Sequence, residues 1–176
     1  MIDKNLINQI ESYLDEHYIS PEWLEEQKKQ GWQFSLNMSL GDSPIKIGRT
    51  ESIIRILKDK IGLAGNYFSN YLFKLIKDKN LTEVEVYKKA HLNRRVFSKI
   101  RNEKDYMPSK RTILAIAIAL ELDFKETNTL LERAGYHLSK GRKEDVIIGY
   151  FIENQIYDIL LINEVLDHYG FKILGE

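Results

Sequence analysis

The sequence predicts an all-α protein. Through most of the chain, apolar residues recur every three or four positions, which is the spacing of an amphipathic helix. Many of these stretches follow a residue type that caps helices. One stretch, residues 113–122, is almost wholly apolar, so we expect other helices to surround it. The alternation of Ile and Ala within it is one of size and not of polarity, and alanine is a strong helix former.

The first 66 residues are expected to form a small N-terminal appendage. Helical spacing predicts a helix over about residues 3–18. Ser20 followed by Pro21 marks the start of a second short helix, because serine caps helices and proline is tolerated at the first helical position.

The rest of this appendage is ambiguous in sequence. Residues 32–40 alternate apolar and polar side chains. This pattern fits a short β-hairpin over residues 32–48, or an extended segment lying along a helical domain. Residues 50–61 return to helical spacing, and Gly62 and Gly65 then mark a boundary between domains.

Residues 67–137 are expected to form a five-helix domain. The first helix ends near Asn80, and the last ends at Gly135. Thr82 with Glu85 has the spacing of a capping box, in which each side chain bonds the other residue's backbone. The four helices that follow the first are expected to begin after the N-caps Thr82, Asn93, Ser109 and Asp123.

Residues 138–176 are expected to add a C-terminal extension of two helices, over about 143–153 and 158–169. Eleven large apolar or aromatic residues crowd into residues 147–162. One helix face cannot bury them all against a small domain. We therefore expect part of this surface to pack on the N-terminal segment or on a second subunit.

The composition and motifs exclude several classes of protein. There are 43% hydrophobic residues, enough to fill a core, and no cysteines, so disulfides and thiol chemistry are absent. No window is long and apolar enough to span a membrane, and the N-terminus lacks the layout of a secretory signal, which together predict a cytoplasmic protein. The four histidines show no metal-ligand spacing, and no motif indicates a cofactor or an enzyme.

The charge is unevenly distributed along a chain whose net charge is zero. Residues 67–112 hold 12 Lys and Arg against 5 Asp and Glu, a balance of +7. The segments before and after are acidic, at −2 and −5. A basic segment inside a neutral chain suggests a surface that faces a polyanion, although solvated helix faces would give the same count.

The residues from Leu72 to Leu122 resemble the lambda-repressor-like, or Xre-type, helix-turn-helix family. The resemblance is carried by Val86-Tyr-Lys-Lys-Ala-His-Leu-Asn93, by Phe97-Ser-Lys-Ile100 and by the Pro108-Ser109 that precedes the apolar helix. A wider stretch, residues 67–175, is similar to a bacterial helix-turn-helix module often found C-terminal to macro domains. The chain departs from the family at Glu83, where glutamine is usual, and at residues 101–103, where Glu-x-Gly is common.

The resemblance implies double-stranded DNA as the partner of a transcriptional regulator, with helix 93–102 in the major groove. Helical spacing that buries Phe97 and Ile100 turns the opposite face outward. The residues expected to contact bases are Arg94, Arg95, Ser98 and Lys99. The residues expected to contact phosphates are Lys88, Lys89, Asn93, Lys104, Lys110 and Arg111.

Two further expectations concern partners. A homodimer would suit DNA binding, since two-fold symmetry presents two such helices to successive major grooves. The alternative function is an antitoxin-like or adaptor module with the same fold, whose acidic and apolar C-terminal helices bind a protein and which has no specific DNA target.

Overall fold

The computed structural model describes residues 2–23, 64–103 and 106–175. In these ranges the chain forms helices and no strands, which confirms the all-α class. The helices are α1 (Lys4–His17), α4 (Ala64–Asp78), α5 (Glu83–Lys89), α6 (Arg94–Asn102), α7 (Lys110–Ala119), α8 (Phe124–Arg133), α9 (Lys143–Glu153) and α10 (Ile159–His168). The predicted hairpin over 32–48 and the predicted helix over 50–61 lie outside the described residues.

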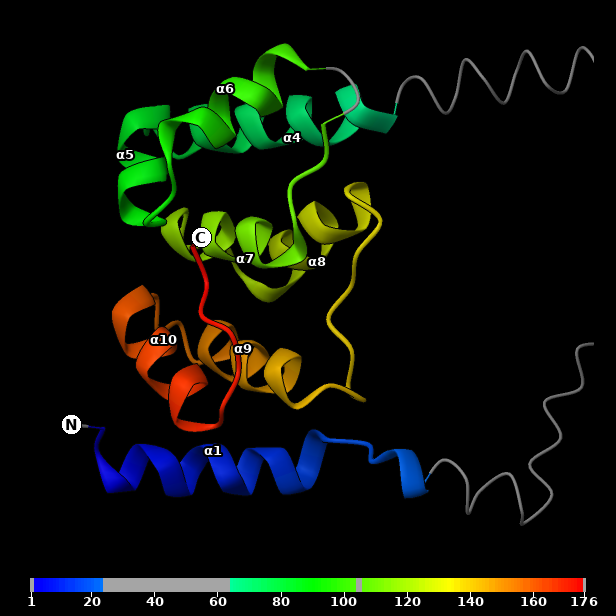
Figure 1. Ribbon diagram of the computed structural model, residues 1–176, viewed down its shortest axis with the longest axis vertical. Coiled ribbons are helices and arrows are strands. Elements are labelled where there is room, and N and C mark those ends of the chain that lie inside the picture. The colour runs from blue at the N-terminus through cyan, green and yellow to red at the C-terminus, as the bar shows by residue number, and fades with distance from the viewer. Residues whose placement is uncertain (1, 24–63, 104–105, 176) are drawn as a thin grey trace, which may run out of the picture.

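The helices stack along the long axis of the molecule (Figure 1). Helices α4, α5 and α6 lie at one end, α7 and α8 follow, α9 and α10 come next, and α1 closes the opposite end. Residues 112–119, which are most of α7, are buried, as expected for the apolar stretch that other helices surround. Helix α7 packs against α5, α8 and α10 and so joins the layers.

The predicted helix starts are confirmed by their hydrogen bonds. Thr82 with Glu85, and Asp123 with Glu126, each form a complete capping box. The side chains of Asn93 and Ser109 accept backbone N–H groups in the first turns of α6 and α7. One start differs: α4 begins at Ala64, so Gly65 lies inside a helix and does not precede it.

Six helices end in the same way, with one residue in the left-handed region followed by an apolar residue. The N–H of the apolar residue returns to the last turn of its helix, as in Leu81 N–H to Ile76 O at 3.0 Å. The left-handed residues are Asn80, His91, Glu121, Gly135, Gln155 and Gly170. The apolar residues that follow them are Leu81, Leu92, Leu122, Tyr136, Ile156 and Phe171.

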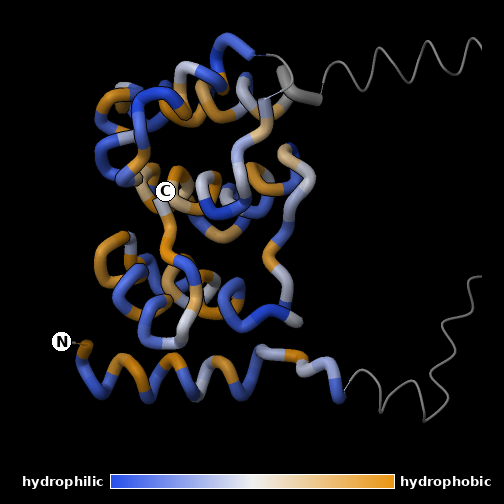
Figure 2. Tube along the Cα trace, in the orientation of Figure 1, coloured by the Kyte–Doolittle hydropathy of each residue, from blue (hydrophilic) through white to orange (hydrophobic). Residues whose placement is uncertain are grey.

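The N-terminal helix α1 covers α9, which resolves the crowding predicted for the C-terminal helices (Figure 2 shows hydrophobic and hydrophilic residues alternating along α1). Ile10 and Leu14 of α1 are buried. The Tyr13 hydroxyl donates to Glu153 at 2.7 Å, and its ring meets Tyr150 edge to face. Burial, and then the hydrogen bond to Glu153, raise the pKa of Tyr13.

The C-terminal tail runs from α10 back to the turn between α5 and α6. The side-chain amide of Asn163 bonds both backbone groups of Leu174, accepting at 2.8 Å and donating at 3.1 Å. Gly175 has a φ of +102°, and a Cβ there would lie 2.7 Å from the carbonyl oxygen of Ala90. The tail therefore rests directly on the backbone that leads into α6 (the red segment in Figure 1).

Candidate nucleic-acid interface

Helices α5 and α6 are joined by a tight turn over residues 90–93. His91 takes a φ of +51°, which reverses the chain after α5. The Leu92 amide then donates to Tyr87 O at 2.9 Å, and the Leu92 side chain is buried. The rings of Tyr87 and Phe97 pack 6.1 Å apart across the two helices. These contacts fix the direction in which α6 leaves the turn.

Helix α6 buries one face and exposes the other. Phe97 is 2% exposed and Ile100 is 4% exposed, because both enter the core beneath the helix. The side chains that the sequence assigned to DNA bases are all exposed: Arg94, Arg95, Ser98 and Lys99. Asn93 caps the helix, and its side chain accepts the Arg95 amide at 2.9 Å.

The exposed basic side chains of this face carry no acidic partner among the described residues. Arg94, Arg95 and Lys99 form no ion pair there. The Lys99 ammonium lies 5.3 Å from the centre of the Tyr106 ring, an arrangement that leaves its charge available. Ser98 accepts from Asn102 at 3.3 Å, so its hydroxyl hydrogen remains free to donate.

Two positions at which the sequence differs from the helix-turn-helix pattern that it resembles contact each other. Arg101 at the end of α6 forms an ion pair with Glu83 at the start of α5. The Arg101 guanidinium also lies over the Phe73 ring of α4, 5.2 Å from its centre. The Glu83 carboxylate thus has a partner within the chain, and Arg101 contacts residues of both α5 and α4.

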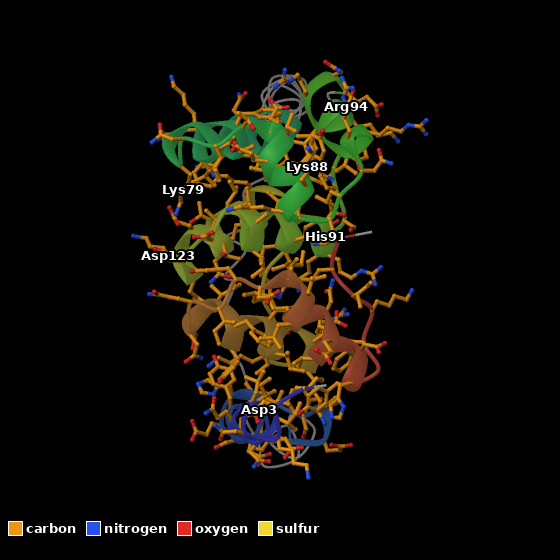
Figure 3. All side chains as sticks on the ribbon, turned by 90° about the vertical axis from the view of Figure 1, so that its left-hand side faces the viewer. Asp3, Lys79, Lys88, His91, Arg94 and Asp123 are labelled. Carbon is orange, nitrogen blue, oxygen red and sulfur yellow. The ribbon has the colours of Figure 1, made fainter. Side chains whose placement is uncertain are left out.

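The predicted phosphate contacts on α5 lie beside α6. Lys88 and Lys89 are exposed at the end of α5, and Figure 3 shows Lys88 at the same end of the molecule as Arg94. Lys89 lies 3.4 Å from the Glu121 carboxylate, with both side chains more than half exposed. Such an exposed pair contributes little, so Lys89 can exchange this partner at small cost.

Two of the other predicted phosphate residues, Lys110 and Arg111, lie on α7 and not on the exposed face of α6. Lys110 bonds Asp145 of α9 at 2.5 Å, and this carboxylate is only 1% exposed, so the lysine serves an internal pair. Arg111 lies on the rim of a cavity between α7, α9 and the tail. Lys104 lies outside the described residues.

Two pKa shifts show where acidic groups of the neighbouring helices lie. Glu85 accepts from the backbone and hydroxyl of Thr82, which lowers the pKa of its carboxyl group. Tyr157 lies among Asp123, Glu121 and Glu126, and its burial, followed by these acids, raises the pKa of its phenol. The acids of the turn between α7 and α8 and of early α8 are therefore grouped around Tyr157.

Comparisons with family models, with curated proteins and with solved structures find no match to this chain. Of the described helices, none is long and apolar enough to cross a membrane. No group of three His, Asp or Glu side chains within the described ranges could hold a metal ion.

Sequence reasoning missed the partners that hold the interface in place. It singled out Glu83 and residues 101–103 as unusual, but it did not pair Glu83 with Arg101. It also predicted that Lys110 contacts a DNA phosphate, whereas the Lys110 side chain forms an ion pair with Asp145. The opposite charges of the two residues in each pair were the only hint in the sequence. The two residues lie on different helices, and the spacing of residues within one helix does not predict contacts between helices.

Proposed function

We propose that this chain binds duplex DNA through α6 and acts as a transcriptional regulator. In this proposal α5, the turn and α6 serve as a helix-turn-helix unit, with the N-terminal half of α6 in the major groove. Arg94 and Arg95 donate to guanine O6 and N7, and Ser98 and Lys99 contact neighbouring base edges or phosphates. Lys88 and Lys89 bind the phosphate backbone and set the orientation of the protein.

One observation carries the proposal. The outer face of α6 presents three basic side chains that have no acidic partner in the described part of the chain, while its inner face is fixed in the core. A solvated helix face in a protein of zero net charge would ordinarily mix both signs. The Glu83 carboxylate, which reaches α6, is already paired with Arg101.

The charges of this surface predict how binding depends on salt. Five lysines and arginines, namely Lys88, Lys89, Arg94, Arg95 and Lys99, can each neutralise a phosphate. The slope of log K against log salt is then about −4.5, since each phosphate contact contributes about −0.9. Removing two of these charges should reduce the slope to about −2.7.

The test is fluorescence anisotropy with labelled duplex DNA over a series of salt concentrations. The variant is Arg95→Ala with Lys99→Ala, and the matched control is Lys125→Ala with Lys140→Ala, which removes the same charge from exposed positions outside this surface. We expect the control to bind as the unaltered protein does and the α6 variant to lose affinity and slope. Failure of the unaltered protein to bind at low salt, or equal binding by both variants, would contradict the proposal.

The sequence also allowed a protein-binding module that used its apolar C-terminal helices. Most of that apolar surface packs within the chain, because α1 covers α9. Leu160 is the main exception, with 63% of its surface exposed. The internal packing of α9 favours DNA as the partner over a protein bound at these helices.

The proposal includes a homodimer on a two-fold symmetric site. Two copies of α6 would then meet major grooves about 34 Å apart, one helical turn of DNA. Selection of binding sites from random duplexes tests this: inverted repeats with a fixed spacing of about 10 base pairs are expected, and single unrepeated sites would contradict the dimer.

A further inference from the structure

A cavity of about 780 Å³ lies between α7, the loop from α8 to α9, the start of α9 and the C-terminal tail. Its size is within the range of sites that bind small organic molecules. The end of α10 also lines it at Leu166, so five segments of the chain contribute and the cavity belongs to the packed fold and not to one loop. It is separate from the exposed face of α6, none of whose residues line it.

Apolar residues form part of the lining of this cavity. Leu114 of α7, Ile148 of α9, Leu166 of α10 and Leu174 of the tail line it. These four side chains are only 1–2% exposed, so the more accessible apolar surface is that of Tyr136 and Phe171, two partly buried rings that also line the cavity. An apolar group placed here would leave water and contact these two rings.

The rim of the cavity is cationic once the internal ion pairs are taken into account. Its two acids are already paired: Asp145 with Lys110, and Glu144 with Arg142. Asp145 also accepts the Ser139 amide at 2.9 Å.

Two cations on the rim remain. Arg111 and Lys172 line the cavity and form no ion pair with any described residue. They come from different segments, since Arg111 belongs to the first turn of α7 and Lys172 to the tail. His137, from the loop between α8 and α9, adds a polar ring to the same rim.

We propose that this cavity binds a small organic anion with an apolar body. The apolar body packs on Tyr136 and Phe171, and the carboxylate, sulfonate or phosphate accepts hydrogen bonds from Arg111 and Lys172. Charge-assisted bonds to two separate segments would hold α7 and the tail together. The proposal is independent of DNA binding, because it concerns the free protein.

The test uses a matched pair of fluorescent probes. The anion is 8-anilinonaphthalene-1-sulfonate, and the neutral counterpart is N-phenyl-1-naphthylamine, which has the same aromatic body without the sulfonate. The variant is Arg111→Gln with Lys172→Gln, and the control is Lys77→Gln with Lys125→Gln, two exposed lysines that do not line the cavity. Circular dichroism of each protein confirms that it is folded before titration.

We expect the sulfonate to bind the unaltered protein at one saturable site, about tenfold or more tighter than the neutral probe. The cavity variant should lose about that factor for the sulfonate while its affinity for the neutral probe stays the same. The control variant should bind both probes as the unaltered protein does. Absence of saturable binding, equal affinity for the two probes, or equal loss in both variants would overturn the proposal.

Discussion

Replacing Gln155 with glycine should stabilise the protein. Gln155 ends α9 with a φ of +56°, in the left-handed region that side chains with a Cβ disfavour. Its side chain is exposed and makes no hydrogen bond or ion pair with a described residue. The substitution therefore removes backbone strain and little else.

The expected gain follows from two opposing terms. Left-handed backbone costs a residue with a Cβ about 1–2 kcal/mol, and glycine avoids this cost. Glycine also makes the unfolded chain more flexible, which costs about 0.5–1 kcal/mol. The net gain in the free energy of unfolding is about 0.5–1 kcal/mol, or a rise of about 1–4 °C in Tm for a chain of this length.

Urea denaturation followed by circular dichroism measures the change, and the chain supplies its own reciprocal controls. Gly135 and Gly170 end α8 and α10 in the same conformation, and a Cβ at either would have no atom within 4 Å. Gly135→Ala and Gly170→Ala should thus each lose about the amount that Gln155→Gly gains. Gln155→Ala keeps the strain and should be close to neutral. The reasoning is refuted if Gln155→Gly is less stable than the unaltered protein, or if the alanine variants lose nothing.

Three other substitutions test contacts between and within helices. Lys110→Met leaves the buried Asp145 carboxylate without its cation and should destabilise the protein by about 3–5 kcal/mol in urea unfolding. Adding Asp145→Leu to this variant should recover most of the lost stability. A double variant with no recovery would contradict a buried ion pair. Glu85→Gln weakens the start of α5 at neutral pH. Because the pKa of Glu85 is lowered in the folded state, its carboxylate contributes above the ordinary glutamate pKa, and this contribution is lost as the pH falls through the lowered value; the stability difference should therefore shrink in acid, and a difference that grows would refute the assignment. Tyr13→Phe removes the hydrogen bond to Glu153 and should lower the free energy of unfolding by about 1 kcal/mol. Amide exchange in α1 should become faster. Unchanged exchange there would show that this bond does not hold α1 in place.

Local features of the fold were predictable from sequence because they depend on neighbouring residues. The capping boxes of α5 and α8 need only a Thr or Asp followed three positions later by Glu. Helix α9 spans Lys143–Glu153, as its apolar spacing predicted. The outward face of α6 followed from the same spacing, once Phe97 and Ile100 were assigned to the core.

Contacts between segments that are distant in the sequence were harder to predict. The sequence predicted that the crowded apolar residues of the C-terminal helices would need a cover, and it named two candidates; packing of α1 on α9 selects the N-terminal segment within this chain. It could not foresee that Lys110 would face Asp145, since both residues lie in first turns whose relative placement depends on how two layers pack. The cavity beside them likewise exists only through that packing.

The close contact of Gly175 with the turn before α6 affects how cooperatively the protein unfolds. Layers stacked end to end interact mainly with their immediate neighbours, so the end that carries α6 could open while the rest stays folded. The tail passes from α10 to that end, and Asn163 anchors it on the way. Opening around α6 would therefore also release Gly175, while Leu174 stays bonded to Asn163, so amide exchange at Leu174 should follow that of α10 more closely than that of α6.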